Sequence, residues 1–194
     1  GSTATAEEGY AFVNWTDEEG NVVSWDAAYV PDKVGGLNVA ATYTANFAED
    51  KNDDDIPDPY QRTITYKVIN GQWNDETSED KTEIVTLMAG GHYDENGTAN
   101  LANVPEVGKK PAAGYEAGSW NPTPENGMEI TKDSATTFTY TYTEKDNVTI
   151  NYTVNDAEMG SVDPENESLA PATGEAEGST ATAEEGYAFV NWTD

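Results

Sequence analysis

A segment of seventeen residues occurs twice in this chain, once at each end. Residues 1–17 read GSTATAEEGYAFVNWTD, and residues 178–194 read the same. Chance does not produce seventeen identical residues, so the chain carries a tandem duplication. Such repetition is typical of proteins in which small structural units follow one another along the chain.

Two related modules lie within one period of the repeat. In each, a glycine is followed by a tyrosine, four further residues and a tryptophan. The glycines and tryptophans of this pattern are Gly9 and Trp15, Gly114 and Trp120, and Gly186 and Trp192. The shared spacing predicts that the three tryptophans occupy equivalent positions and pack in equivalent ways.

Four segments alternate between apolar and polar residues, which is the pattern of a β-strand with one buried face. Two of these segments open the modules and two close them. The apolar residues that share a face are Ile64, Tyr66 and Val68; Val148, Ile150, Tyr152 and Val154; Phe138, Tyr140 and Tyr142; and Val39, Ala41, Tyr43, Ala45 and Phe47. We therefore predict a sheet in each module, with Thr and Asn on its other face.

The order of these strands predicts the domain boundaries. Residues 62–145 form a complete module, and residues 48–61 form an acidic linker before it. The other module is divided, with its N-terminal part in residues 146–194 and its C-terminal part in residues 1–47. A divided sheet exposes unpaired backbone and apolar side chains. We therefore expect residues 1–47 to complete the 146–194 part of a neighbouring copy, in a head-to-tail array or filament.

Composition favours strands and turns over helices. Only 36% of the residues are hydrophobic, so any core must belong to a small module. Thr, Asn, Gly and Tyr are abundant, as in β-structure with many turns. Residues 98–104, TANLANV, precede Pro105 and are expected to form one or two helical turns. The predicted fold class is mainly β: tandem small β-grasp-like modules, with at most one short helix each, in an elongated array.

Charge and residue usage exclude several classes of function. The formal net charge is -28, which repels nucleic acid and anionic membrane surfaces, so neither is an expected partner. The absence of cysteine rules out a disulfide scaffold and a thiolate metal site. The single histidine, His92, lies in a turn-like segment and has no nucleophile or acid at a catalytic spacing. We therefore predict that the protein is not an enzyme.

Residues 9–47 carry a family resemblance. Their sequence, GYAFVNWTDEEGNVVSWDAAYVPDKVGGLNVAATYTANF, resembles the internalin B-repeat and the Listeria–Bacteroides repeat group. The other module, with TITYKVINGQW, AGYEAGSW and TFTYTYT, is similar to companion repeats of the same large adhesins. The resemblance implies β-grasp-like modules along a Gram-positive surface protein, and therefore an extracellular location at the cell wall without catalysis.

The segment between the modules carries oxygen-bearing side chains at alternate positions. This is the ligand spacing of an EF-hand-like loop, in which alternate residues turn toward a calcium ion. It also resembles the calcium loops of thrombospondin type 3 repeats. With bound calcium, the loop would fix the angle between the modules. The predicted ligands are the side chains of Asp50, Asn52, Asp54, Asp58 and Gln61 and the carbonyl of Ile56.

Two positions of this loop depart from the EF-hand pattern. Asp55 stands at the sixth position, where a glycine normally makes the sharp turn, and Gln61 stands where a glutamate binds with both oxygens. The second change is expected to weaken binding. The alternative interpretation is a metal-free acidic linker, whose carboxylates repel one another and extend the chain.

These observations lead to two functional hypotheses. The first is a structural repeat of an adhesin stalk or fibre, which is stiffened by calcium and associates with neighbouring copies. The second is a carbohydrate- or mucin-binding module for host or cell-wall glycans. In it, Trp25 and Trp73, which lie beside turns, would present exposed rings to sugar faces; packing against neighbouring strands is the competing role for both.

Overall fold

The computed structural model describes residues 1–194, and its regular structure is β apart from one turn of 3-10 helix. The predicted mainly β fold class is therefore confirmed. The chain divides into two compact units, which are described separately. The first unit comprises residues 1–67, 80–105 and 120–139, and the second comprises residues 68–79, 106–119 and 140–194.

The strands are short, and three of them contribute residues to both units. Those three are β6 (Gln61–Ile69), β13 (Tyr115–Asn121) and β15 (Thr137–Glu144). The first unit also holds β1 (Ser2–Thr3), β2 (Tyr10–Thr16), β3 (Val22–Ser24), β4 (Ala28–Tyr29), β5 (Thr44–Glu49), the 3-10 helix η1 (Asp58–Tyr60), β8 (Lys81–Thr86), β9 (Met88–Ala89), β10 (His92–Tyr93), β11 (Ala99–Asn100) and β14 (Glu129–Ile130). The second unit holds β7 (Gly71–Gln72), β12 (Lys110–Pro111), β16 (Val148–Asn151), β17 (Gly160–Asp163), β18 (Asn166–Leu169) and β19 (Thr180–Ala183).

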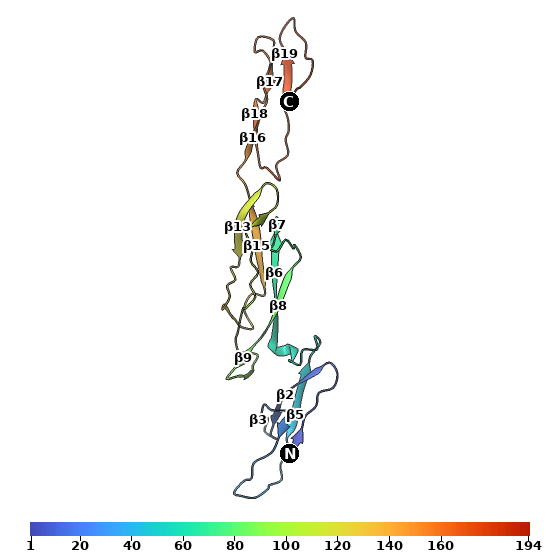
Figure 1. Ribbon diagram of the computed structural model, residues 1–194, viewed down its shortest axis with the longest axis vertical. Coiled ribbons are helices and arrows are strands. Elements are labelled where there is room, and N and C mark those ends of the chain that lie inside the picture. Colours follow the sequence, from blue (N-terminus) through green and yellow to red (C-terminus); the bar gives the residue numbers. More distant parts are fainter. The chain divides into compact units, whose positions relative to one another are not determined.

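A three-stranded antiparallel sheet forms around the first copy of the repeated segment, in the order β3–β2–β5 (Figure 1). Ala11, Val13 and Trp15 alternate along β2 and are buried, as a half-buried strand requires. On the other face, the rings of Phe12 and Phe47 meet edge to face with centroids 5.8 Å apart. Pairing of β2 with β5 thus places the aromatic residues of the two strands in contact.

The strand predicted over residues 38–47 is displaced toward the C-terminus. Strand β5 begins only at Thr44, which lies opposite Thr16, the last residue of β2. Residues 38–43 extend past the end of β2 and belong to no strand. The prediction that Val39 and Ala41 share a buried face is therefore wrong, because a strand face is buried only where other strands hold the backbone extended.

The four-stranded sheet has the order β13–β15–β6–β8. In the first unit, the buried ring of Tyr66 stacks on Phe138 at 5.9 Å and meets Trp120 edge to face at 6.2 Å. Ile64, two residues before Tyr66, is also buried. Burial, and secondarily the nearby Glu83 carboxylate, raise the pKa of Tyr66 well above its usual range. The alternation predicted for this strand and for Phe138 is confirmed.

In the second unit, the buried side chain of Tyr142 joins three backbone groups from two segments. Its hydroxyl donates to the carbonyl of Gln72 at 2.8 Å and accepts from the N–H groups of Gly108 at 3.1 Å and Lys110 at 3.0 Å. The ring also meets that of Tyr140 edge to face, with centroids 5.0 Å apart. A buried hydroxyl with donor and acceptor partners rigidifies the loops that it joins.

The helix expected at residues 98–104 is absent, and that prediction is wrong. The segment instead contains β11, which pairs with β14. The buried Glu83 carboxylate of β8 accepts hydrogen bonds from the N–H groups of Ala102 at 3.2 Å and Asn103 at 2.7 Å. These contacts hold the segment against the sheet, and Leu101 is buried beside them. Tertiary contacts therefore override the weak local helix preference.

Two antiparallel strand pairs form the C-terminal part of the second unit, β16 with β18 and β17 with β19 (Figure 1). The strand predicted over residues 148–154 ends at Asn151. Val148 and Ile150 share a face, as predicted, but that face is exposed. A two-stranded pair does not bury a face without a further layer, which explains the difference.

Replacing Tyr142 with Phe tests the joining role of its hydroxyl. The substitution keeps the ring but leaves two N–H groups and one carbonyl without a partner. We expect Tyr142→Phe to lower the free energy of unfolding by about 1–3 kcal/mol in urea denaturation. Tyr10→Phe, at a tyrosine that is half exposed, is the matched control and should change it by less than about 0.5 kcal/mol.

Candidate functional site

The acidic segment that follows β5 is a folded loop shaped by Asp50. This residue is buried, and its N–H donates to the carbonyl of Gly9 at 2.9 Å. The Asp50 carboxylate accepts hydrogen bonds from the N–H groups of Asp54 at 3.2 Å and Asp55 at 2.9 Å. Asp50 therefore turns the chain back on itself, as aspartates in tight turns do.

Three of the predicted calcium ligands come together in this loop. One oxygen of the Asp54 carboxylate accepts hydrogen bonds from the side-chain amides of Asn52 at 3.0 Å and Gln61 at 2.7 Å. The Asn52 amide also donates to the side-chain oxygen of Gln61 at 3.3 Å. The hydrogen bond from Gln61, with smaller contributions from Ile56 and Asn52, lowers the pKa of Asp54, so its carboxylate is charged at neutral pH.

The position that departs from the EF-hand glycine still makes a sharp turn. Asp55 has φ of 64°, and Asp53 has φ of 57°, both in the left-handed region. Aspartate enters this region more readily than most residues because its short side chain bonds to the local backbone. The loop thus makes the sharp turn without a glycine at its sixth position.

One other predicted ligand, Asp58, is also hydrogen-bonded within the loop, and so is the backbone N–H of Ile56, whose carbonyl is the predicted ligand atom. The Asp58 carboxylate accepts from the N–H of Lys51 at 3.2 Å, and the N–H of Ile56 donates to Asp54 at 2.9 Å. The structure places no group of three or more carboxylates and histidines where together they could hold a metal ion. Asn52, Asp54 and Gln61 offer the oxygen atoms that calcium takes, whereas Asp50 is occupied by backbone N–H groups. The calcium site stays a prediction.

Trp73 is a core residue. Its side chain is 0% exposed, and its indole N–H donates to the carbonyl of Glu79 at 2.8 Å. The interpretation of Trp73 as an exposed sugar platform is therefore wrong. Trp25 is half-buried, and its ring stacks on that of His92, with centroids 4.5 Å apart and planes 6° from parallel. His92 is a surface residue on β10, as its turn-like surroundings predict.

The two copies of the repeated segment adopt different structures. In the first copy, residues 10–16 are strand β2, and Val13 and Trp15 are each 7% exposed. In the second copy, the same residues form no strand; Val190 is 86% exposed and Trp192 is 48% exposed. The prediction that the repeated tryptophans pack in equivalent ways is therefore wrong, because only the first copy has partner strands on both sides.

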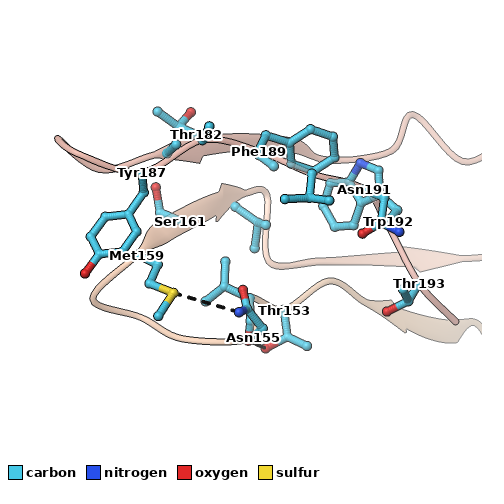
Figure 2. Close-up of a pocket in the computed structure, with 17 residues that line it drawn as sticks. Thr153, Asn155, Met159, Ser161, Thr182, Tyr187, Phe189, Asn191, Trp192 and Thr193 are labelled. Carbon is cyan, nitrogen blue, oxygen red and sulfur yellow. Dashed lines mark hydrogen bonds between the residues drawn. The ribbon is translucent and has the colours of Figure 1, made fainter.

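A groove of about 500 Å³ lies between the exposed second copy and the β17–β19 pair. Figure 2 shows Phe189 and Trp192 along one side of this groove, with Tyr187 and Met159 near its other end. The rings of Phe189 and Trp192 are 6.0 Å apart, and that of Tyr152 is 6.1 Å from Trp192. None of the lining residues is charged. The sequence alone did not predict this groove, although residues 187–193 of the repeated segment line one side of it.

Comparison with known proteins matches the two ends of the chain to one family. The family of the divergent InlB B-repeat domain matches residues 2–51 and 150–194, just under half of the chain. Both segments are therefore similar to B-repeat domains of bacterial surface proteins, in agreement with the B-repeat resemblance. Each of them includes one copy of the repeated segment. No curated protein and no solved structure matches the chain. No helix has the length and apolarity that crossing a membrane requires.

Removing the buried carboxylate tests what holds the acidic loop in shape. Asp50→Ala leaves two N–H groups without their acceptor, so we expect it to lower the free energy of unfolding by about 1–3 kcal/mol in calcium-free buffer. Asp32→Ala, at an exposed aspartate, removes the same charge and should change it by less than about 0.5 kcal/mol. Equal effects of the two substitutions would show that charge, and not the hydrogen bonds, is responsible.

Proposed function

We propose that this chain is a structural repeat unit of an extracellular bacterial surface protein, in which it serves as a spacer or stalk segment. The observation that carries the proposal is the identical segment at both ends, each copy lying in a stretch similar to B-repeat domains. Repetition suits a stalk because each unit adds length without a new binding requirement. Neighbouring units associate head to tail along the array.

Charge supports the same role. A net charge of -28 on 194 residues keeps neighbouring stalks apart and keeps the protein soluble outside the cell. The large aromatic side chains of the central core are used for packing, as Trp73, Tyr66 and Tyr142 are buried. A spacer requires folded, mutually repelling units, and it requires no reactive group.

The acidic loop is proposed to bind calcium and to stiffen the connection between modules. Asp54, Asn52 and Gln61 already meet, and the left-handed Asp55 supplies the turn. Rotation of the two side-chain amides by half a turn would present their oxygens beside the Asp54 carboxylate, the donor set of an oxygen-liganded calcium ion. Calcium would also relieve the repulsion between the carboxylates of the loop.

The glycan-binding hypothesis is less favoured. Of its two tryptophans, Trp73 is buried, and one face of Trp25 is covered by His92. A sugar platform needs an open aromatic face, because stacking requires contact with the ring. Host or cell-wall glycans are therefore not part of the function proposed here.

Calcium is expected to raise the melting temperature of the protein. Extracellular calcium modules bind with a Kd of about 0.1–1 mM, so about 10 mM calcium would stabilise the folded loop by about 1.4–2.7 kcal/mol. Differential scanning calorimetry with and without calcium measures the shift. The matched pair is Asp54→Asn, which should abolish it, and Asp53→Asn, which removes the same charge outside the predicted ligand set and should not.

An unchanged melting temperature at millimolar calcium would remove the calcium site from the proposal. An equal shift in all three proteins would instead indicate general screening of the acidic surface, since screening does not depend on a particular carboxylate.

The surface location has a separate test. Antibodies raised against this chain should label intact cells of the source organism, and protease treatment of those cells should remove the label. Labelling that requires permeabilised cells would contradict the proposed location.

A further inference from the structure

The second copy of the repeat lacks the strands that order the first. Strands β3 and β5, which pair with β2, both lie within residues 18–50. Residues 187–193 have the sequence of β2 but form no strand, and their side chains are exposed. Identical residues have identical intrinsic preferences, so the difference between the copies comes from the partner strands. The second copy is therefore a strand sequence whose partners are not beside it.

Residues 18–50 show the complementary feature. Val30, Val34, Leu37 and Val39 of this segment are all exposed, with Val30 and Leu37 at least 70% accessible. The first copy has no equivalent of the β17–β19 pair beside it, since its residues Ser2–Thr3 pair with β4 instead. Each end of the chain thus exposes an apolar surface next to the repeated segment. The N-terminal end has no counterpart of the β17–β19 pair, and the C-terminal end has no counterpart of β3 and β5.

Charge marks the same two surfaces. The protein carries a formal charge of -28, yet the groove lined by residues 153–155, 159–162, 181–183 and 187–193 contains no charged lining residue. Residues 33–48 likewise contain one lysine and no acidic residue. Two surfaces of so acidic a chain can approach each other closely only where acidic side chains are absent, because like charges facing each other oppose association.

We propose that residues 187–193 and the adjoining groove bind residues 18–50 of a second copy of this repeat, which continuation of the repeat period would place directly after Asp194. The register follows from the pairing of β2 with β5, in which Phe12 lies opposite Phe47, Asn14 opposite Asn46 and Thr16 opposite Thr44. In the composite sheet, Phe189 lies opposite Phe47 of the second copy, and Thr193 lies opposite Thr44 of the second copy. The added strands complete a sheet, as in β-strand addition.

This inference rests on the proposed repeat architecture and specifies the unit of assembly. The folded module would consist of residues 146–194 of one copy and residues 18–50 of the next. Burial of Val190 and Trp192 would accompany its formation, as Val13 and Trp15 are buried in the first copy.

A thiol placed on the exposed strand tests the proposal. The chain has no cysteine, so Val190→Cys introduces the only thiol, at a position that is 86% exposed. The variant is compared with an extended protein in which residues 18–50 are appended after Asp194. We expect a maleimide reagent to modify the thiol at least about tenfold more slowly in the extended protein, because the appended strands must first open.

Two controls accompany this comparison. Val13→Cys, at the equivalent position of the first copy, should react slowly in both the original and the extended protein. An extension with the same residues in scrambled order should leave the Val190→Cys thiol as reactive as it is in the original chain. Equal reactivity with and without the true extension, or equal protection by the scrambled one, would overturn the proposal.

Limited proteolysis tests the same prediction without any amino-acid substitution. Chymotrypsin should cleave the original chain after Tyr187 and Phe189, and residues 187–193 of the extended protein should resist it. Cleavage at equal rates would again overturn the inference. Its failure would leave the calcium and cell-surface tests unaffected, since those depend on residues 50–61 and on the location of the protein.

Discussion

Pairing between strands that are distant in the sequence holds the ordered parts of this chain in place. Strand β2 pairs with β5 across a loop of more than twenty residues, and the order of the four-stranded sheet brings β15 beside β6. Such contacts require loops to close before they contribute any stability. Each strand depends on a partner strand for its backbone hydrogen bonds, and the structure has no α-helix whose hydrogen bonds are local.

The small cores of this protein rely on aromatic rings and on satisfied polar groups. Few long aliphatic residues are present, and the aromatic residues Trp73, Tyr66 and Phe138 are among the largest fully buried side chains. Buried polar side chains connect backbone segments through hydrogen bonds. The Tyr142 hydroxyl joins three backbone positions, and the Glu83 carboxylate holds the segment after β11. An acidic surface over such cores is consistent with the spacer role proposed for this chain.

Alternating residues predicted the central strands correctly, because a pleated strand with one buried face allows no other pattern. Ile64, Tyr66 and Phe138 are buried as expected. Alternation failed at Val148 and at Val39, since it shows which residues share a face but not whether another layer covers that face. In the acidic loop, ligand spacing predicted that Asn52, Asp54 and Gln61 would converge, as they do. It did not predict that backbone N–H groups would occupy the Asp50 carboxylate.

The repeated segment separates what the sequence determines from what the fold decides. Seventeen identical residues determine which side chains can share a strand face, and the alternation of Ala11, Val13 and Trp15 is the same in both copies. Whether those side chains are buried depends on the partner strands. In the first copy, β3 and β5 pair with β2 on both sides. The second copy pairs only through β19, and its Trp192 is exposed. A strand is stable only when another backbone takes its hydrogen bonds, and a local sequence does not contain that partner.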